Sequence, residues 1–277
     1  MTRLVSSRRS KILLLFILAF GSAICIFAQP TKDPKVSLGS KTAKDGFRNE
    51  TEIAGKFNNW KLDADATAWL ASMGYKALEI ESVFASKPHG EKTDVQVRVK
   101  TSRGEFIEGI SIKLVSSPNG FNQVDKRWLS HYAKLWKMPT EVVDGLKLFL
   151  GETKPNKPSR NAERMFLNEL DAETQKSVIA FFTENKEAIV SDILEGDGTF
   201  AAKWFLVAYK ATDKPRWILK SSSDASKFFS EGSVSITRAG NLKIGRITMQ
   251  RKGGDGGRET AKMLQFKINP ALLLDTR

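Results

Sequence analysis

The sequence predicts a mixed α/β domain with an appended β-rich C-terminal part. Three successive stretches, residues 77–85, 93–100 and 109–117, have the pattern of β-strands separated by turn residues. The following region, residues 123–194, shows mostly helical spacing. Strand patterns then resume and continue through the C-terminal part of the chain, at residues 201–210, 216–220, 232–237, 242–252 and 261–268.

The composition permits a folded domain and favours a negatively charged partner. The 277 residues are 41% hydrophobic, which is sufficient for a substantial core and argues against global disorder. Lysine and arginine number 44 against 31 aspartate and glutamate residues, a formal net charge of +13. This balance is typical of proteins that bind nucleic acid, a membrane surface or an acidic polymer, although simple solubility is the alternative.

Cysteine and histidine are too few for two common kinds of site. The chain has one cysteine, Cys25, and two histidines, His89 and His131. A disulfide within the chain and a Cys/His zinc site are therefore excluded. Any bound metal must be a hard cation held by oxygen atoms.

The N-terminal segment has the pattern of a secretory signal. Basic residues precede an uncharged run from Ile12 to Ala28, and a small residue stands before Gln29. The run is short for a spanning helix, which needs about 20 apolar residues, so we expect no stable membrane association. Residues 30–41, with two prolines and several small or charged residues, have the composition of a linker.

Two helices are expected before the first strand. Residues 41–60 have apolar side chains at positions 43, 47, 53, 54 and 57, which is roughly helical spacing. Asp63 is placed to cap a second helix that includes Trp69 and Leu70.

The strands at 93–100 and 109–117 combine a carboxylate with a lysine. Ser111 and Lys113 alternate with apolar residues and therefore share one face, and Asp94 begins the polar face of the preceding strand. Such a pair on adjacent strands is the core of a magnesium-dependent nuclease site, in which the carboxylate holds the metal and the lysine steadies the attacking water or the developing charge. These sites usually have an acidic or amide ligand where Ser111 stands. A surface ion pair fits the same loose spacing.

The turn after the second of these strands displays an aromatic residue. Pro-Asn-Gly predicts the turn, and Phe121 stands at its far edge. Phe121 is either a core residue or loop anchor, or a wedge between base pairs. In the second case the amides of Asn122 and Gln123 could reach base edges.

The residues that follow this turn combine acidic and basic groups. Asp125, Arg127 and Trp128 are expected to open a helix. At that position Lys126 and Arg127 would suit contacts with phosphate groups.

A glycine-rich segment near the C-terminus concentrates polar side chains. Residues 250–260 predict the tip of a hairpin, and their chemistry fits G·C pairs, because arginine or lysine donates to guanine and aspartate accepts from cytosine. An exposed turn without this role is the alternative, and a nucleotide-binding loop is not expected. The polar residues are Gln250, Arg251, Lys252, Asp255 and Arg258.

Several mixed segments together resemble one known family. They are "LGSKTAKDGF", "GFNQVDKRWL", "FAAKWFLVA", "RWILK" and "GRITMQRKGGDGGRETAKMLQFKI". From about Val36 to its end, the chain resembles the HinP-type type II restriction endonucleases, which recognise GCGC and belong to the PD-(D/E)xK nuclease superfamily. The resemblance implies one endonuclease domain over residues 36–277, with a mixed sheet flanked by helices. It also implies Mg²⁺-dependent cleavage of double-stranded DNA after the first G of GCGC.

The same resemblance implies roles for residues of the paired strands. Asp94, after Thr93, matches the metal-binding aspartate, and Lys113 matches the catalytic lysine. Ser111 stands where the family has glutamine, and the gap from Asp94 is two residues shorter. Water or the Ile112 carbonyl would then complete the metal ligands, or activity is reduced.

Other residues acquire roles by the same likeness. Glu50 is a further acidic group near the site. Phe121 matches the residue that inserts into the duplex, with Asn122 and Gln123 beside it. The 250–258 loop resembles part of the base-reading surface.

The expected partners and location follow from this family. Double-stranded DNA is the substrate, and a cognate cytosine methyltransferase would protect the same site in the host. The protein is expected to act as a monomer or a dimer. Residues 1–35 are either a signal-like segment or an extension from a mis-assigned upstream start, so the protein is cytoplasmic in the second case and exported in the first.

Two other functions remain open from the sequence. The first is a catalytically inactive GCGC-binding protein, because Ser111 departs from the family pattern. The second is an exported basic protein that binds nucleic acid or another polyanion, which requires the signal to be real.

Overall fold

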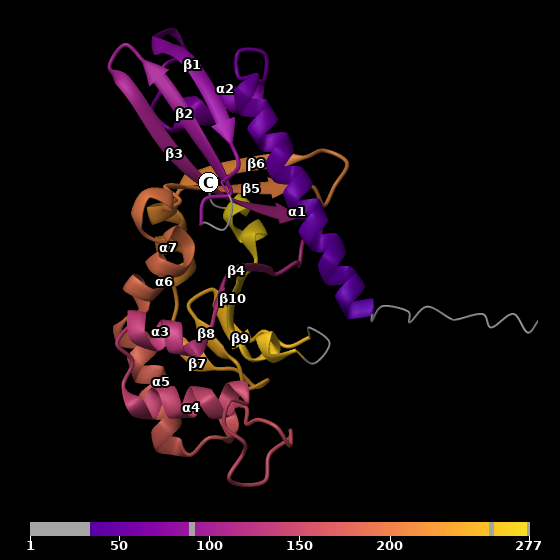
Figure 1. Ribbon diagram of the computed structural model, residues 1–277, viewed down its shortest axis with the longest axis vertical. Coiled ribbons are helices and arrows are strands. Elements are labelled where there is room, and N and C mark those ends of the chain that lie inside the picture. The colour runs from indigo at the N-terminus through magenta and orange to yellow at the C-terminus, as the bar shows by residue number, and fades with distance from the viewer. Residues whose placement is uncertain (1–33, 89–91, 255–257, 276–277) are drawn as a thin grey trace, which may run out of the picture. The chain divides into compact units, whose positions relative to one another are not determined.

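The computed structural model describes residues 34–88, 92–254 and 258–275, and these residues form two five-stranded sheets (Figure 1). The first sheet has the strand order β1-β2-β3-β5-β6. Its neighbours are antiparallel except for β3 and β5, which are parallel. The prediction of a mixed sheet is therefore confirmed. Its strands are β1 (Ile80–Ser86), β2 (Val95–Thr101), β3 (Gly104–Val115), β5 (Trp204–Tyr209) and β6 (Arg216–Ser221).

Two helices pack on one face of this sheet. They are α1 (Pro34–Asn58) and α2 (Ala64–Ser72), and their apolar residues join the sheet in one core. The Asp63 side chain accepts a hydrogen bond from the main-chain N–H of Ala66 and caps α2, as predicted. The apolar core between the two helices and the first sheet includes Ile53, Phe57, Trp69, Leu70, Val95, Val97, Val99 and Ile110.

The prediction of a linker over residues 30–41 is wrong from Pro34 onward, because α1 begins there. Proline is compatible with the first turn of a helix, where its missing N–H group has no intrahelical partner in any case. The start of α1 lacks apolar periodicity, so the sequence pattern gave no sign of a helix before residue 41.

The second sheet is antiparallel and has the order β4-β10-β9-β8-β7. Four of its strands come from the C-terminal part of the chain, which confirms the predicted β-rich region. The strand expected over residues 242–252 is divided in two at Gly245, whose φ of 56° lies in the left-handed region. The strands are β4 (Asn122–Arg127), β7 (Val234–Ile236), β8 (Leu242–Ile244), β9 (Ile247–Arg251) and β10 (Leu264–Ile268).

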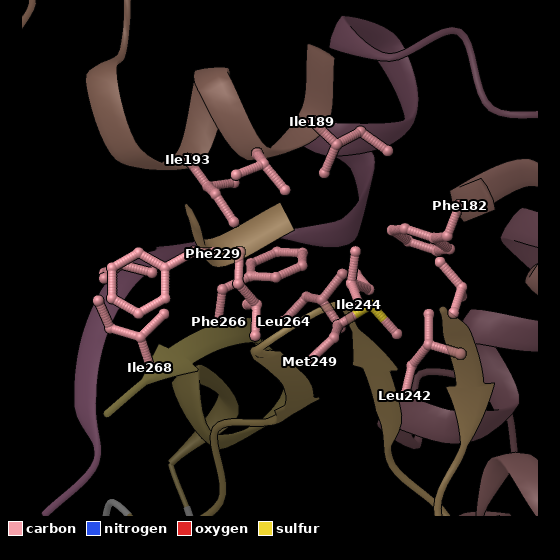
Figure 2. Packing of buried hydrophobic residues seen from close by; sticks show 14 of the residues in the cluster. Phe182, Ile189, Ile193, Phe229, Leu242, Ile244, Met249, Leu264, Phe266 and Ile268 are labelled. Carbon is pink, nitrogen blue, oxygen red and sulfur yellow. The ribbon is translucent and has the colours of Figure 1, made fainter. Parts of the chain in front are cut away.

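Helices from the middle of the chain cover this second sheet. Figure 2 shows their apolar side chains, such as Ile189 and Ile193, packed against sheet residues such as Phe266. Among the described residues, no helix is both long and apolar enough to cross a membrane. The helices are α3 (Leu129–Leu135), α4 (Thr140–Leu150), α5 (Ala172–Glu184), α6 (Lys186–Glu195) and α7 (Ser222–Ser230), and short 3₁₀ turns lie at Ala77–Glu79, Leu167–Glu169, Gly198–Phe200, Glu259–Lys262 and Pro270–Asp275.

The helix expected to open with Asp125, Arg127 and Trp128 is not present. Residues Asn122–Arg127 form strand β4 instead, and α3 begins one residue after Trp128. The segment contains a single apolar residue, so neither strand alternation nor helical spacing was visible in it. Pairing with β10 decides its structure, an example of tertiary context overriding local preference.

Candidate active site

A cleft of about 620 Å³ lies where α1, the start of β2, β3 and β4 meet. α1 contributes Ala43, Gly46, Phe47 and Glu50, at a spacing that places all four on one side of the helix. The other residues that carry polar groups into the cleft include Lys92, Asp94, Ser111, Lys113, Gln123 and Lys126.

Asp94 lies just before β2, and its carboxylate is held by β3. The main-chain N–H of Asp94 donates to the carbonyl of Ile110 at 2.9 Å. The main-chain N–H of Ile112 donates to Oδ2 of Asp94 at 2.6 Å, and the Ser111 hydroxyl lies 3.4 Å from the same oxygen. The main-chain pairing of β2 with β3 ends at Val95. Beyond this point the Asp94 side chain accepts the hydrogen bond from the N–H of Ile112.

Lys113 lies beside this carboxylate, as the sequence predicted. Its Nζ is 3.0 Å from the Ser111 hydroxyl, 3.1 Å from the carbonyl oxygen of Ile112 and 3.5 Å from Oδ2 of Asp94. The prediction that Asp94, Ser111 and Lys113 share one face is confirmed. Ser111 is almost fully buried beneath the other two side chains.

Glu50 brings a second carboxylate to the cleft from α1. Its Oε2 forms an ion pair of 3.0 Å with Nζ of Lys87, which also donates to the carbonyl of Phe47 and lies 3.2 Å from the hydroxyl of Thr51. Burial raises the pKa of Glu50, the hydrogen bond from Lys87 opposes this effect, and the negative charge of Asp94 adds to it. Lys87 therefore keeps the Glu50 carboxylate in the cleft, although burial there disfavours its charged form.

These groups supply an oxygen-only set of possible metal ligands. No group of three or more His, Cys, Asp or Glu side chains converges anywhere in the described ranges. The available donors are the carboxylates of Asp94 and Glu50, the Ser111 hydroxyl and the Ile112 carbonyl. Oxygen donors with room for water are the chemistry that Mg²⁺ prefers.

Strand β4 contains a bulge that aims two polar side chains at the cleft. β10 pairs with Gln123 and with Asp125 but leaves Val124 between them without a partner. The extra residue shifts the alternation of the strand. Gln123 and Lys126 consequently lie on the same face of the sheet, and both line the cleft.

A row of glutamines crosses the same face of the second sheet. Nε2 of Gln265, on β10, donates to Oε1 of Gln123 at 2.6 Å, and Nε2 of Gln250, on β9, lies 3.5 Å from Oε1 of Gln265. Gln265 is opposite both Gln250 and Lys126 in the pairing. Sequence reasoning missed Gln265, because one glutamine within a strand is no signal until its neighbours are known.

Arg127 also lines the cleft, but its guanidinium is engaged within the protein. Its guanidinium lies 2.9 Å from Asp125 and 3.1 Å from Asp192, and it stacks over the ring of Tyr132. Burial opposes its charge, but the two carboxylates outweigh this effect and raise the pKa of Arg127. Lys126 and Arg127 both line the cleft, but the guanidinium of Arg127 is occupied by Asp125 and Asp192.

In the glycine-rich segment, too, one of the basic residues is engaged within the protein. Nε of Arg251 donates to the carbonyl of Leu150 at 2.7 Å and so satisfies the C-terminal end of α4. Lys252 and Arg258 stand on either side of the segment that includes Asp255, which lies outside the described residues. The reading role of this segment stays a prediction.

Phe121 is exposed, at 58% of its full surface. It follows the turn that leaves β3, in which the N–H of Gly120 donates to the carbonyl of Ser117. Nδ2 of Asn122 donates to the carbonyl of Leu114 and fastens the start of β4 to β3. The interpretation of Phe121 as a core residue is therefore wrong. The Asn122 side chain stabilises the loop between β3 and β4.

Lys92 lines the cleft and is a second residue that sequence reasoning missed. Its Nζ donates to the carbonyls of Val124 and Ile193 and lies 4.0 Å from Asp125. Burial lowers the pKa of Lys92 to about 8. A lysine next to a predicted turn normally indicates a solvated side chain, so the sequence contained no signal for this burial.

Comparisons with known proteins agree with this fold. The profile of the family described as R.HinP1I restriction endonuclease matches residues 73–274. The chain is also similar to a crystal structure of the restriction endonuclease MspI in complex with its cognate DNA, with a TM-score of 0.60 over 85% of this chain and 93% of that chain. Identity to MspI is 12%, so this likeness concerns the fold alone. A comparison with curated proteins found no match.

The mixed sheet flanked by helices is that of the type II restriction endonucleases, and its arrangement is consistent with a PD-(D/E)xK fold. The family match covers most of the chain. The protein therefore belongs to the R.HinP1I restriction endonuclease family.

Proposed function

We propose that the protein is a Mg²⁺-dependent endonuclease that cleaves double-stranded DNA at GCGC, after the first G. The observation that carries this proposal is the convergence of Asp94, Ser111 and Lys113 in one cleft with the outward side chains of β4. The cutting residues and the polar strand face are then within reach of the same DNA segment.

The donor set supports a divalent cation in the cleft. Asp94 would be its principal ligand, with Ser111, the Ile112 carbonyl and water as further ligands and Glu50 as a nearby carboxylate. When bound, the cation would polarise the scissile phosphate and lower the pKa of an attacking water. The Ile112 carbonyl is now the acceptor of a hydrogen bond from Lys113, so its use as a ligand requires the lysine to turn toward the phosphate.

Lys113 performs the second task of the site. Its ammonium group lies within 3.5 Å of Oδ2 of Asp94 and can orient the water or neutralise the charge that develops on the phosphate. Ser111 is uncharged, but its hydroxyl accepts a hydrogen bond from Lys113 and keeps the lysine beside the Asp94 carboxylate.

The polar face of β4, β10 and β9 suits the reading of base pairs. Amide side chains and lysines make directional contacts with base edges in the major groove. Gln123 and Lys126 face the cleft, and Gln265 fixes the amide of Gln123. Phe121 is exposed just before this strand, which supports the proposal that it wedges between base pairs.

Electrostatics supports the same substrate. The net charge of +13 favours DNA in a sequence-independent and salt-sensitive way. A solved structure that this chain resembles, that of MspI, contains the cognate DNA of MspI. A host that contains the enzyme would need a cytosine methyltransferase for the same site, and the enzyme would act in the cytoplasm as a monomer or a dimer.

The test is digestion of a plasmid that contains GCGC by the full chain with Mg²⁺, followed by sequencing of the ends. The control is the same plasmid methylated at the cytosine of the site. Cuts after the first G of unmethylated GCGC alone would support the proposal. An intact plasmid, together with tight binding of the GCGC duplex in Ca²⁺, would instead identify a catalytically inactive GCGC-binding protein. The weak metal ligand Ser111 is the feature that favours this alternative. Absence of binding would favour an exported polyanion-binding protein.

A further inference from the structure

Lys92 connects the two sheets at the cleft. It lies two residues before Asp94, in the segment that enters β2. Its Nζ donates to the carbonyl of Val124 in β4 at 2.9 Å and to the carbonyl of Ile193 near the end of α6. Its side chain is 15% exposed, and its stem packs on Gly196.

The contact with Val124 falls on the bulge of β4. A bulged residue is left out of the ladder, so its main-chain groups need other partners. Lys92 supplies the donor for the carbonyl of Val124. The same bulge is what places Gln123 and Lys126 on one face, toward the cleft.

The segment around Lys92 is also tightly held on the side of Asp94. The hydroxyl of Thr93 donates to the carbonyl of Phe200 at 2.8 Å, and Thr93 is almost fully buried. A Cβ atom on Gly109 would lie 2.4 Å from this hydroxyl, so the packing leaves no room for adjustment. A displacement of β4 that moves Lys92 therefore reaches Asp94 through a single constrained residue, Thr93.

We propose that Lys92 is a positioning residue that couples the bulged strand β4 to the carboxylate of Asp94. This proposal rests on the proposed function, in which β4 reads the DNA and Asp94 serves the cleavage step. Contacts of β4 with the correct base pairs then stabilise the position of Asp94 that supports cutting, and incorrect pairs do so less well.

The main-chain amide of Ile112 reports on this coupling without DNA or metal. Its N–H donates to Oδ2 of Asp94, so its hydrogen exchange measures how well the carboxylate is held. The variants are Lys92→Met, which keeps the length of the stem without the donors, and Lys186→Met as the matched control. Lys186 also donates to a main-chain carbonyl, that of Gly232, away from the cleft.

Residue-resolved exchange on the full chain tests the proposal. We expect exchange of the Ile112 amide to be about tenfold faster in Lys92→Met, with the amides of β5 unchanged and Lys186→Met like the wild type. Unchanged exchange at Ile112 would overturn the proposal. An equal increase at every amide would also overturn it, because that result means loss of global stability. If Lys92→Met does not fold, Lys92→Gln, with an amide donor on a shorter stem, is measured by the same criterion.

Cleavage supplies a second readout. The single-turnover rate on a GCGC duplex is compared with that on a duplex with one changed pair. We expect the ratio of the two rates to fall about tenfold in Lys92→Met. A purely structural defect would lower both rates equally and leave the ratio unchanged, which would contradict the coupling. A wild-type protein that does not cut would count against the proposed function, while the exchange at Ile112 would still judge Lys92.

Discussion

The main-chain N–H of Ile112 donates a hydrogen bond of 2.6 Å to Oδ2 of Asp94. This bond holds the carboxylate at the end of the β2–β3 pairing, beside Lys113, before any substrate is present. A ligand that is already in place needs little rearrangement when a cation and a phosphate arrive. The proposed chemistry depends on this arrangement.

Replacement of Ser111 with glutamine should strengthen cation binding. The glutamine amide oxygen is a better ligand for a hard cation than a hydroxyl, and it stands at this position in the family that the sequence resembles. In Ser111→Gln we expect the Mg²⁺ concentration for half-maximal cleavage to fall severalfold, measured by titration under single-turnover conditions. Ser111→Ala is the control, and it should raise that concentration. An unchanged Mg²⁺ requirement in both variants would remove Ser111 from the set of ligands.

Gln123 and Arg127, near the two ends of β4, should respond differently to replacement with alanine. Gln123→Ala should lower discrimination against one changed base pair by about 1–3 kcal/mol, because the side chain faces the cleft. Arg127→Ala should instead lower the free energy of unfolding by about 2 kcal/mol, because Asp125 and Asp192 lose their partner. Urea unfolding and cleavage of paired duplexes measure the two quantities. The reverse assignment of effects would show that Arg127 is the reading residue.

The buried ammonium of Lys92 should make stability depend on pH. Its pKa in the folded protein is about 8, against an ordinary value of 10.5, so above pH 8 the folded state loses a proton that the unfolded state still binds. The unfolded state then binds more protons, and stability rises with pH. Relative to Lys92→Met, the wild type should gain roughly 2 kcal/mol between pH 8 and pH 10.

Urea unfolding at several pH values, with a chelator present, measures this difference. Subtracting the free energy of unfolding of Lys92→Met from that of the wild type cancels the contributions of the other groups that titrate in this range, because methionine is neutral throughout. A flat difference between the two proteins would mean that Lys92 is solvated, which would contradict its hydrogen bonds to Val124 and Ile193.

The sequence predicted the parts of the fold that rest on local pattern. The alternation around Ser111 and Lys113 correctly placed them on one face, because strand geometry has a period of two and both strands are buried on their apolar side. The pairing of Asp94 with that face followed from the short turn between two adjacent strands. The cap at Asp63 is equally local.

The parts that the sequence did not predict depend on distant contacts. The sequence predicts the start of a helix at Asp125, Arg127 and Trp128, but pairing with the distant strand β10 makes Asn122–Arg127 a strand. The bulge at Val124, the ion pair of Arg127 with Asp192 and the hydrogen bond from Lys92 to Val124 all depend on that pairing. None of these features has a pattern within its own segment.

The role of Asp94 is the central claim, and the most direct measurement compares the wild type with Asp94→Asn. Asparagine keeps the size of the side chain and removes its charge. We expect single-turnover cleavage of a GCGC duplex in Mg²⁺ to fall on the order of a hundredfold or more, while binding of the same duplex in Ca²⁺ stays within severalfold of the wild type. Cleavage by Asp94→Asn at the wild-type rate would contradict the account and place the catalytic centre elsewhere.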